Sequence, residues 1–142
     1  MTQPEYWTAL LAATVAAWLF GAIYYGVLGK AWLAAQGKTR ETVKAETAGK
    51  PGFAKAAPFI ASFLAELVMA AILWTVLFQT GMRGATAGAI AGLLCWFGFV
   101  HTTIAVNNAY AFRSRRLTFI DSGHWLGVLV IIGTIVGAWP RR

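Results

Sequence analysis

Charged residues are scarce in this chain. Only 12% of its 142 residues are Asp, Glu, Lys or Arg, against about 25% in soluble domains, whereas 58% are hydrophobic and 14% are aromatic. A soluble fold of this length has too little polar surface to cover so much apolar material. The composition therefore excludes an ordinary water-soluble domain and indicates one domain that is surrounded by lipid.

Cysteine is nearly absent, because Cys95 is the only one and lies inside an apolar run. A single thiol excludes an intrachain disulfide and a thiolate metal cluster. The sequence also lacks a serine-nucleophile motif, a phosphate-binding loop and the histidine–glutamate spacing of a zinc hydrolase. Its two histidines come without a Cys-x-x-Cys-His haem attachment motif. We therefore predict no cofactor and no metal, and the sequence disfavours a membrane enzyme or a haem carrier.

The basic residues give a net charge of +7, but they avoid the apolar runs. Six lie between Lys30 and Lys55, and three more are Arg113, Arg115 and Arg116. Basic residues that gather between long apolar runs are typical of the loops of a membrane protein rather than of a nucleic-acid surface. The sequence therefore predicts a lipid bilayer as a partner and no nucleic acid.

Four apolar stretches are close to the length that a helix needs to cross the roughly 30 Å hydrocarbon core of a bilayer. Neither Lys nor Arg precedes the first stretch, which favours a membrane span over a cleaved signal peptide. In the fourth stretch the fully uncharged part has only 15 residues. Three alternatives complete this span. The helix starts as early as Leu117, the bilayer is locally thinner, or Asp121 and His124 lie in the interface. The predicted spans cover residues 6–28, 58–80, 84–106 and 121–139.

The connections between these stretches define the topology. Residues 30–57 are polar and punctuated by glycine and proline, which predicts a loop with a short surface helix. Pro58 is placed in the first turn of the second helix, where its missing N–H is not needed. Residues 81–83 leave room only for a tight turn, so the second and third helices form an antiparallel hairpin. The predicted fold class is all-α, with residues 1–142 forming a single four-helix transmembrane bundle.

The distribution of charge predicts the orientation of this bundle. The loops after the first and third helices share one side and carry nine Lys and Arg residues, the six and the three named above. The opposite side carries three, which are Arg83, Arg141 and Arg142. Because basic residues concentrate in cytoplasmic loops, we expect both long loops in the cytoplasm and both termini outside it, an N-out/C-out arrangement.

Small residues at four-residue spacing predict where the helices pack. Helices in lipid associate through close backbone contact, and glycine permits the closest approach. The third helix has such a spacing in its first half, and the fourth helix repeats it twice. The predicted packing positions are Gly84, Gly88, Gly92, Gly98, Gly123, Gly127, Gly133 and Gly137.

Polar side chains from all four helices fall at one depth, near the end that carries the basic loops. A charged side chain at that depth is expensive, so it normally faces the bundle interior and needs a partner. The sequence therefore predicts a cavity open to the cytoplasm, with a polar cluster of Tyr25, Glu66, His101, Asn108, Asp121 and His124.

Each of these residues also has a purely structural interpretation, and the sequence leaves both open. These interpretations are an N-cap role for Asp121, a hydrogen bond from His101 to Glu66, an interfacial position for His124, a place in the aromatic belt for Tyr25, and a helix C-terminus for Asn108.

Several short segments, taken in their order and spacing, resemble the DUF1761 family of small bacterial membrane proteins, a family of unassigned function. The resemblance implies a four-helix, multi-pass protein of the bacterial cytoplasmic (inner) membrane, and it supplies no catalytic residue, substrate or cofactor. The matching segments are Phe20 to Tyr25, Gly29 to Trp32, Trp96 to Phe99 with Asn107, Ile120 to His124, and Gly137 to Trp139.

Two functions are favoured over the membrane enzyme or haem or metal carrier, which is the less favoured third. In the first, the polar cavity binds or translocates a proton, a cation or a small solute. In the second, the chain is a structural or accessory subunit that packs against a larger membrane complex through its glycine-rich faces. A homo-oligomer would suit the first function, because four helices make a thin pathway.

Overall fold

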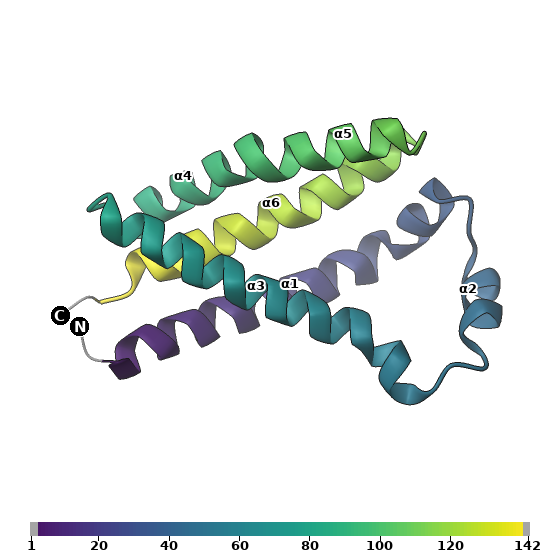
Figure 1. Cartoon of the computed structure of the whole chain (residues 1–142), viewed down its shortest axis with the longest axis horizontal. Coiled ribbons are helices and arrows are strands. Elements are labelled where there is room, and N and C mark those ends of the chain that lie inside the picture. Colours follow the sequence, from purple (N-terminus) through teal and green to yellow (C-terminus); the bar gives the residue numbers. More distant parts are fainter. Residues whose placement is uncertain (1–2, 141–142) are drawn as a thin grey trace.

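The computed structural model describes residues 3–140, and within this range every regular element is a helix. Four long helices run back and forth between two ends of the molecule (Figure 1). The start of α1 and the end of α6 lie at one end, and one short helix lies beside the other end (Figure 1). The elements are α1 (Gln3–Ala35), α2 (Arg40–Thr47), α3 (Gly52–Gln79), α4 (Ala85–Cys95), η1 (Trp96–His101), α5 (Thr102–Tyr110) and α6 (Arg115–Ala138).

The predicted all-α fold with four membrane-length helices is confirmed. α1, α3, the continuous α4–η1–α5 segment and α6 are each long and apolar enough to cross a membrane. Large hydrophobic side chains such as Leu19, Ile23, Leu64 and Ile72 point outward from these helices and are exposed. An outer surface of this kind suits hydrocarbon and not water.

Several helix boundaries differ from those expected, and the third span continues to Tyr110 instead of residue 106. α1 continues to Ala35, beyond the predicted end at Leu28, and α3 begins at Gly52, so Pro58 lies inside that helix and not in its first turn. Alanine-rich residues before Pro58 favour helix and allow this early start. α6 begins at Arg115, because Ser114 is its N-cap and accepts a hydrogen bond from the backbone N–H of Leu117 at 3.2 Å.

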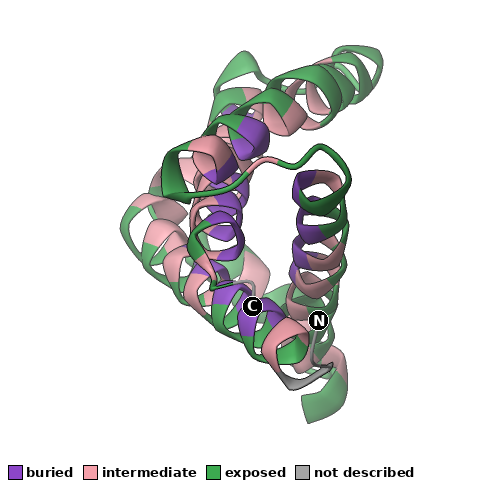
Figure 2. Ribbon diagram, turned by 90° about the vertical axis from the view of Figure 1, so that its left-hand side faces the viewer, coloured by how far each residue is buried: buried purple, intermediate pink, exposed green. Residues whose placement is uncertain are grey.

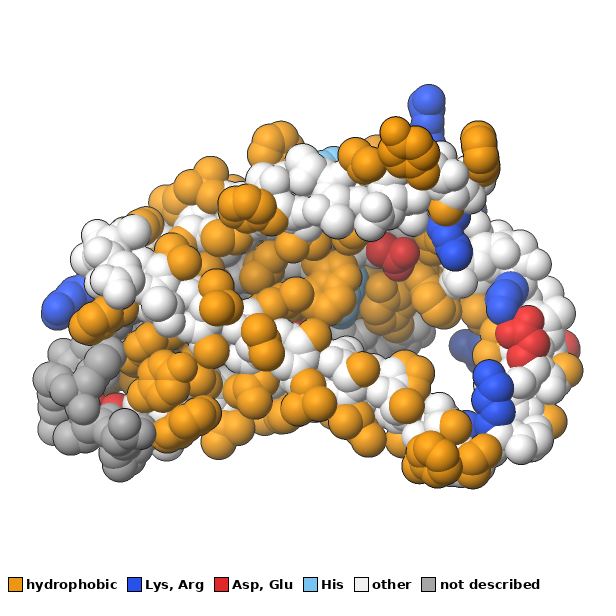
Figure 3. All heavy atoms as spheres, in the orientation of Figure 1, with side chains coloured by type: hydrophobic (Ala, Val, Ile, Leu, Met, Phe, Trp, Pro, Cys, Tyr) orange, Lys and Arg blue, Asp and Glu red, His pale blue; other side chains and the backbone are white. Residues whose placement is uncertain are grey.

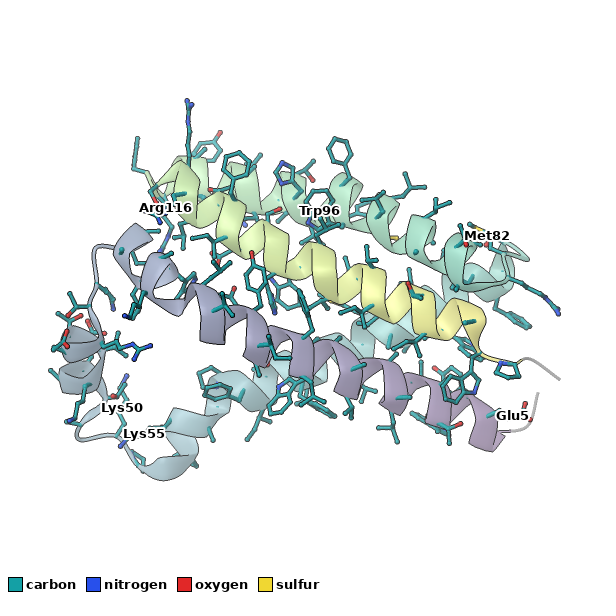
Figure 4. All side chains as sticks on the ribbon, turned by 180° about the vertical axis from the view of Figure 1, so that it is seen from behind. Glu5, Lys50, Lys55, Met82, Trp96 and Arg116 are labelled. Carbon is teal, nitrogen blue, oxygen red and sulfur yellow. The ribbon has the colours of Figure 1, made fainter. Side chains whose placement is uncertain are left out.

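The long connection after α1 contains the expected short surface helix, α2. Thr39 and Thr42 form a reciprocal capping box at its start, with hydrogen bonds of 2.9 and 3.3 Å. Lys38 pairs with Glu46 at 2.7 Å across the same helix. The basic residues gather at this end of the molecule, where Figure 4 labels Lys50, Lys55 and Arg116, whereas Glu5 and Met82 lie at the other end.

α4 and α6 lie side by side and make the closest helix contact (Figure 1). Gly88 packs on the backbone of Gly133, and Gly92 packs on the backbone of Leu129, so an added Cβ at either glycine would overlap a carbonyl oxygen. The Gly84 N–H donates to the Gly137 carbonyl at 2.8 Å across the same pair. Glycine allows this approach because it has no side chain.

The buried core occupies the half of the molecule that contains the termini. The inner faces of α1, α3 and α6 meet there, and buried residues line them (Figure 2). Toward α2 the helices α1 and α3 diverge (Figure 1), and the apolar core does not continue between them. This divergence positions the candidate site. The core residues on these three helices include Ala9, Leu10, Ala13, Ala17, Ala70, Leu73, Trp74, Leu77, Val128, Ile132 and Val136.

Candidate functional site

A cavity of about 680 Å³ opens where α1 and α3 diverge. α6 contributes one residue to its wall, and α2 lies at its outer end. In Figure 3 an opening is visible between α2 and the neighbouring ends of α1 and α3. Most of the wall is apolar. The lining residues with polar groups are Trp18, Tyr25, Trp32, Arg40, Ser62, Glu66 and His124.

Glu66 is the acidic residue of this cavity. It lies on the same face of α3 as the buried residues Ala70 and Leu73, and its side chain is only 1% exposed. Its Oε2 atom is buried and has no hydrogen-bond partner among residues 3–140. A buried polar atom without a partner is rare in folded proteins, because its desolvation is uncompensated. Glu66 therefore has a hydrogen-bonding atom without a partner, where the buried core of α3 gives way to the cavity.

His124 presents a second such atom from α6. The imidazole is 4% exposed, and its Nδ1 has no hydrogen-bond partner within the described part of the chain. The ring stacks on Phe20, with centroids 6.3 Å apart and planes 13° apart, and it lies 4.9 Å from the ring of Tyr25. Its other nitrogen faces Gly21, where an added Cβ would lie 2.8 Å from Nε2. Gly21 therefore makes room for the imidazole.

Asp121 is held beside the cavity by two donors from α1. The Tyr25 hydroxyl donates to Asp121 Oδ1 at 3.2 Å, and Trp32 Nε1 donates to the same oxygen at 2.8 Å. The alternative of an N-cap role for Asp121 is wrong, because α6 begins at Arg115 and Asp121 lies inside it. The additional turns of α1 beyond Leu28 are what bring Trp32 to this carboxylate.

His101 lies apart from the cavity. Its Nδ1 is 2.7 Å from Ser122 Oγ, and Trp96 Nε1 donates to the Ser122 carbonyl at 2.7 Å, so both η1 side chains bind α6. Figure 4 labels Trp96 at mid-length in the bundle. No hydrogen bond joins His101 to Glu66 within residues 3–140, so the predicted bond between them is wrong. The physical reason is that η1 packs on α6, whereas Glu66 lines the cavity between α1 and α3.

Asn108 also lies outside the cavity, and its side chain donates to Thr118 Oγ1 at 3.1 Å between α5 and α6. The predicted cluster therefore divides in two. Tyr25, Glu66 and His124 line the cavity with Asp121 directly behind Tyr25, whereas His101 and Asn108 tie the α4–η1–α5 segment to α6.

Sequence reasoning missed four polar residues of the cavity wall, and one of them is Trp32, the donor to Asp121. Trp18 donates from Nε1 to the Phe59 carbonyl at 3.2 Å and so joins α1 to α3 across the cavity. Ser62 lies one turn before Glu66 on α3, and Arg40 reaches the outer end from α2. The spacing of Ser62 and Glu66 was visible in the sequence, but the contribution of α2 depends on the path of the loop.

The predicted packing glycines differ in what surrounds them. Gly127 makes room for the Phe20 ring and Gly123 for the Tyr24 hydroxyl, which donates to the Ile120 carbonyl at 2.9 Å. Gly98 packs against nothing, since an added Cβ would find no atom of the described chain within 4 Å. The reason is that η1 turns Gly98 to the exposed side of its helix.

Chemically, the cavity combines an apolar wall with a carboxylate and an imidazole that each have an unused atom. These groups suit a molecule with an apolar body and a polar group. Among residues 3–140 no group of three or more His, Cys, Asp or Glu side chains is arranged to hold a metal ion.

These features define the class of the protein as a bundle of four membrane-length helices, with a cavity between α1 and α3 near α2. The chain belongs to the family described as protein of unknown function (DUF1761), which matches residues 8–137. This match confirms the resemblance seen in the short sequence segments. Comparisons with the curated proteins and with the solved structures found no match. The family description names no activity, so the geometry of the cavity is the guide to function.

Proposed function

We propose that this chain is a multi-pass membrane protein that binds a small amphiphilic molecule in the cavity between α1 and α3. Glu66 and His124 would hold the polar group of that molecule. The observation that carries the proposal is the pair of buried, unpartnered atoms, Glu66 Oε2 and His124 Nδ1, which belong to two residues that line one cavity. A volume of about 680 Å³ lies within the range of small-molecule sites.

The energetics of the two unpartnered atoms support a ligand site. A buried polar group without a hydrogen bond destabilises a fold by about 1–3 kcal/mol. A sequence selected only for stability would place an apolar side chain at position 66, in line with Ala70 and Leu73. Local departures from stability of this kind are expected at functional sites, where the missing partner is supplied by a ligand.

The shape of α1 supports the same proposal. Gly26 and Gly29 line the cavity, and an added Cβ at either would meet no atom of the described residues within 4 Å. These glycines therefore leave space in the cavity and serve no helix contact. Together with Ala22 they form a wall of small residues, against which a ring system or an alkyl chain can lie.

Filling this space is expected to abolish binding without harming the fold. We predict that Gly26→Leu lowers the affinity for the neutral probe 1-pyrenemethanol at least about tenfold, because the new side chain occupies the cavity. The protein is placed in nanodiscs of zwitterionic lipid, and energy transfer from tryptophan to pyrene is measured against empty nanodiscs. Trp18 and Trp32 in the wall are the two of the seven tryptophan donors that line the cavity.

The matched control is Gly98→Leu, which adds the same side chain at a glycine that also has open space but lies outside the cavity. Both variants should unfold at temperatures close to that of the parent. Equal binding by the Gly26 and Gly98 variants, or no saturable binding by the parent, would refute the proposed function.

We propose that the protein has the N-out/C-out orientation, because its basic residues concentrate at one end of the bundle. The α2 end carries the nine basic residues of two loops, and the hairpin between α3 and α4 carries Arg83. In a Cys95→Ser background, we expect Gly49→Cys to react with a membrane-impermeant maleimide only after the cells are permeabilised. Met82→Cys should react in intact spheroplasts, and the reverse pattern would contradict the orientation.

A further inference from the structure

We propose that the ligand of the cavity is an amphiphilic organic cation, whose ammonium group pairs with the Glu66 carboxylate. This inference rests on the proposed function, and it adds the charge and chemical class of the ligand. It is carried by three observations: a buried carboxylate without an ion-pair partner among residues 3–140, the set of hydrogen-bond acceptors, and the aromatic wall.

The acidic group of the cavity is buried, whereas the basic group is exposed. Glu66 is the carboxylate among the lining residues, and Arg40 is the lining residue with a positive charge. Asp121 receives two hydrogen bonds, whereas Glu66 Oε2 receives none from the described residues. Because an isolated charge in a low-dielectric region is costly, a ligand with a positive charge supplies the partner that the protein leaves out.

The acceptors fit an ammonium group, which has three N–H donors. Glu66 Oε2 accepts one of them, and His124 Nδ1 accepts another when its ring carries the proton on Nε2. Ser62 lines the same wall one turn from Glu66, and its hydroxyl already donates to the Phe59 carbonyl at 2.9 Å. Its oxygen therefore remains an acceptor. The unpartnered atoms of the lining residues are thus acceptors and favour a donor ligand.

The aromatic wall favours a cation for a second reason. Trp18, Tyr25 and Trp32 line the cavity, and the rings of Tyr25 and Trp32 meet edge to face with centroids 5.5 Å apart. Indole and phenol rings attract an organic cation through the negative potential of their faces, and desolvation strengthens this attraction. An acidic group beside aromatic rings in an apolar cavity is a combination that binds organic ammonium ions.

An amphiphile is favoured over a hydrated metal ion. The wall is mostly apolar, and no metal-ligand cluster occurs among residues 3–140. The charged or titratable groups that line the cavity with Glu66 are Tyr25 from α1, His124 from α6 and Arg40 from α2. Arg40 is exposed at the outer end, among other basic residues, and repels hydrated cations there. A cation with an apolar body reaches the cavity from the lipid, between α1 and α3.

The test compares two probes with the same body, the cation 1-pyrenemethylamine and the neutral 1-pyrenemethanol, in zwitterionic nanodiscs. We expect the parent protein to bind the amine at least about tenfold more tightly than the alcohol. Glu66→Gln keeps the size of the side chain and removes its charge, so it should reduce this ratio to about one while the alcohol binds as before. Glu5→Gln removes a charge at the opposite end of the molecule, where Figure 4 labels Glu5, and should leave the ratio unchanged.

The outcomes separate this inference from the proposed function. If the parent binds both probes equally and Gly26→Leu blocks both, the cavity binds amphiphiles but has no preference for a cation, and the inference is overturned alone. If the preference for the amine persists in Glu66→Gln, the cation lies elsewhere, which also overturns it. If neither probe binds the parent, both the inference and the proposed function fail.

Discussion

Replacing Gly88 with alanine should lower the free energy of unfolding by about 3 kcal/mol, although alanine is the better helix former. The added Cβ would overlap the Gly133 carbonyl oxygen, which belongs to the backbone of α6 and has no rotamer by which to move away. The two helices must therefore separate, and they lose contacts along their whole length. Thermal unfolding in a mild detergent, followed by tryptophan fluorescence, measures the change.

Gly133→Ala on the facing helix should have a similar effect, because its Cβ would overlap the Gly88 carbonyl oxygen. The two substitutions separate the same pair of helices, so the double variant should lose less than the sum of the single losses. Gly98→Ala is the matched control. Its Cβ has open space, so the gain in helix propensity, up to about 1 kcal/mol, should appear as added stability. Equal effects at Gly88 and Gly98 would contradict the contact between α4 and α6.

The number of membrane-length helices was predictable from the sequence because hydrocarbon excludes charge over a fixed thickness. That constraint acts on each helix separately, and it needs no knowledge of neighbours. The ends of the helices were less predictable. Ser114 and Asp121 are both good N-cap residues. The structure places the cap at Ser114, whose hydroxyl also donates to the Ala35 carbonyl at the end of α1, a contact between distant parts of the chain.

The depth of the polar residues was also predictable, but their grouping was not. His101 and Glu66 enter the bundle from the same end, but a uniform helical projection of the third helix places His101 about 180° from Gly92, which packs on α6. The structure has a π-helical turn over Trp96–His101 that changes the angle between successive residues, and it directs His101 to Ser122 of α6. Short apolar sequences contain no signal for such a turn. Glu66 and His124 line the same cavity because α3 and α6 both pack on α1, and the sequence does not specify these helix neighbours.

The glycine pattern shows the same limit. Four-residue spacing identified Gly88, Gly92, Gly133 and Gly137, all of which lie in the contact between α4 and α6. It did not identify the partner of each face. The accessory-subunit hypothesis relied on these faces to bind another protein, but inside this bundle they bind each other. Glycines with no regular spacing, such as Gly21, have the clearer link to the cavity, because Gly21 makes room for His124.

The carboxylate of Glu66 should be a source of instability, and removing it should stabilise the protein. We predict that Glu66→Met raises the free energy of unfolding of the ligand-free protein by about 1–3 kcal/mol. Methionine has a similar length and no polar group, so it extends the buried stripe of Ala70 and Leu73 and leaves no unpartnered oxygen. The same variant should lose its preference for the cationic probe. Denaturant titration of the protein in detergent measures the stability.

Asp121→Leu is the matched control for this prediction, because it also replaces a carboxylate with an apolar side chain. Asp121 lies at the same depth, but it accepts hydrogen bonds from Tyr25 and Trp32, so its removal leaves two donors without an acceptor. We expect a loss of about 1–3 kcal/mol, opposite in sign to the effect at Glu66. A carboxylate retained for structure is one whose removal destabilises the fold. If Glu66→Met were as destabilising as Asp121→Leu, Glu66 would be retained for structure, and the proposal that the cavity binds a ligand through Glu66 would be refuted.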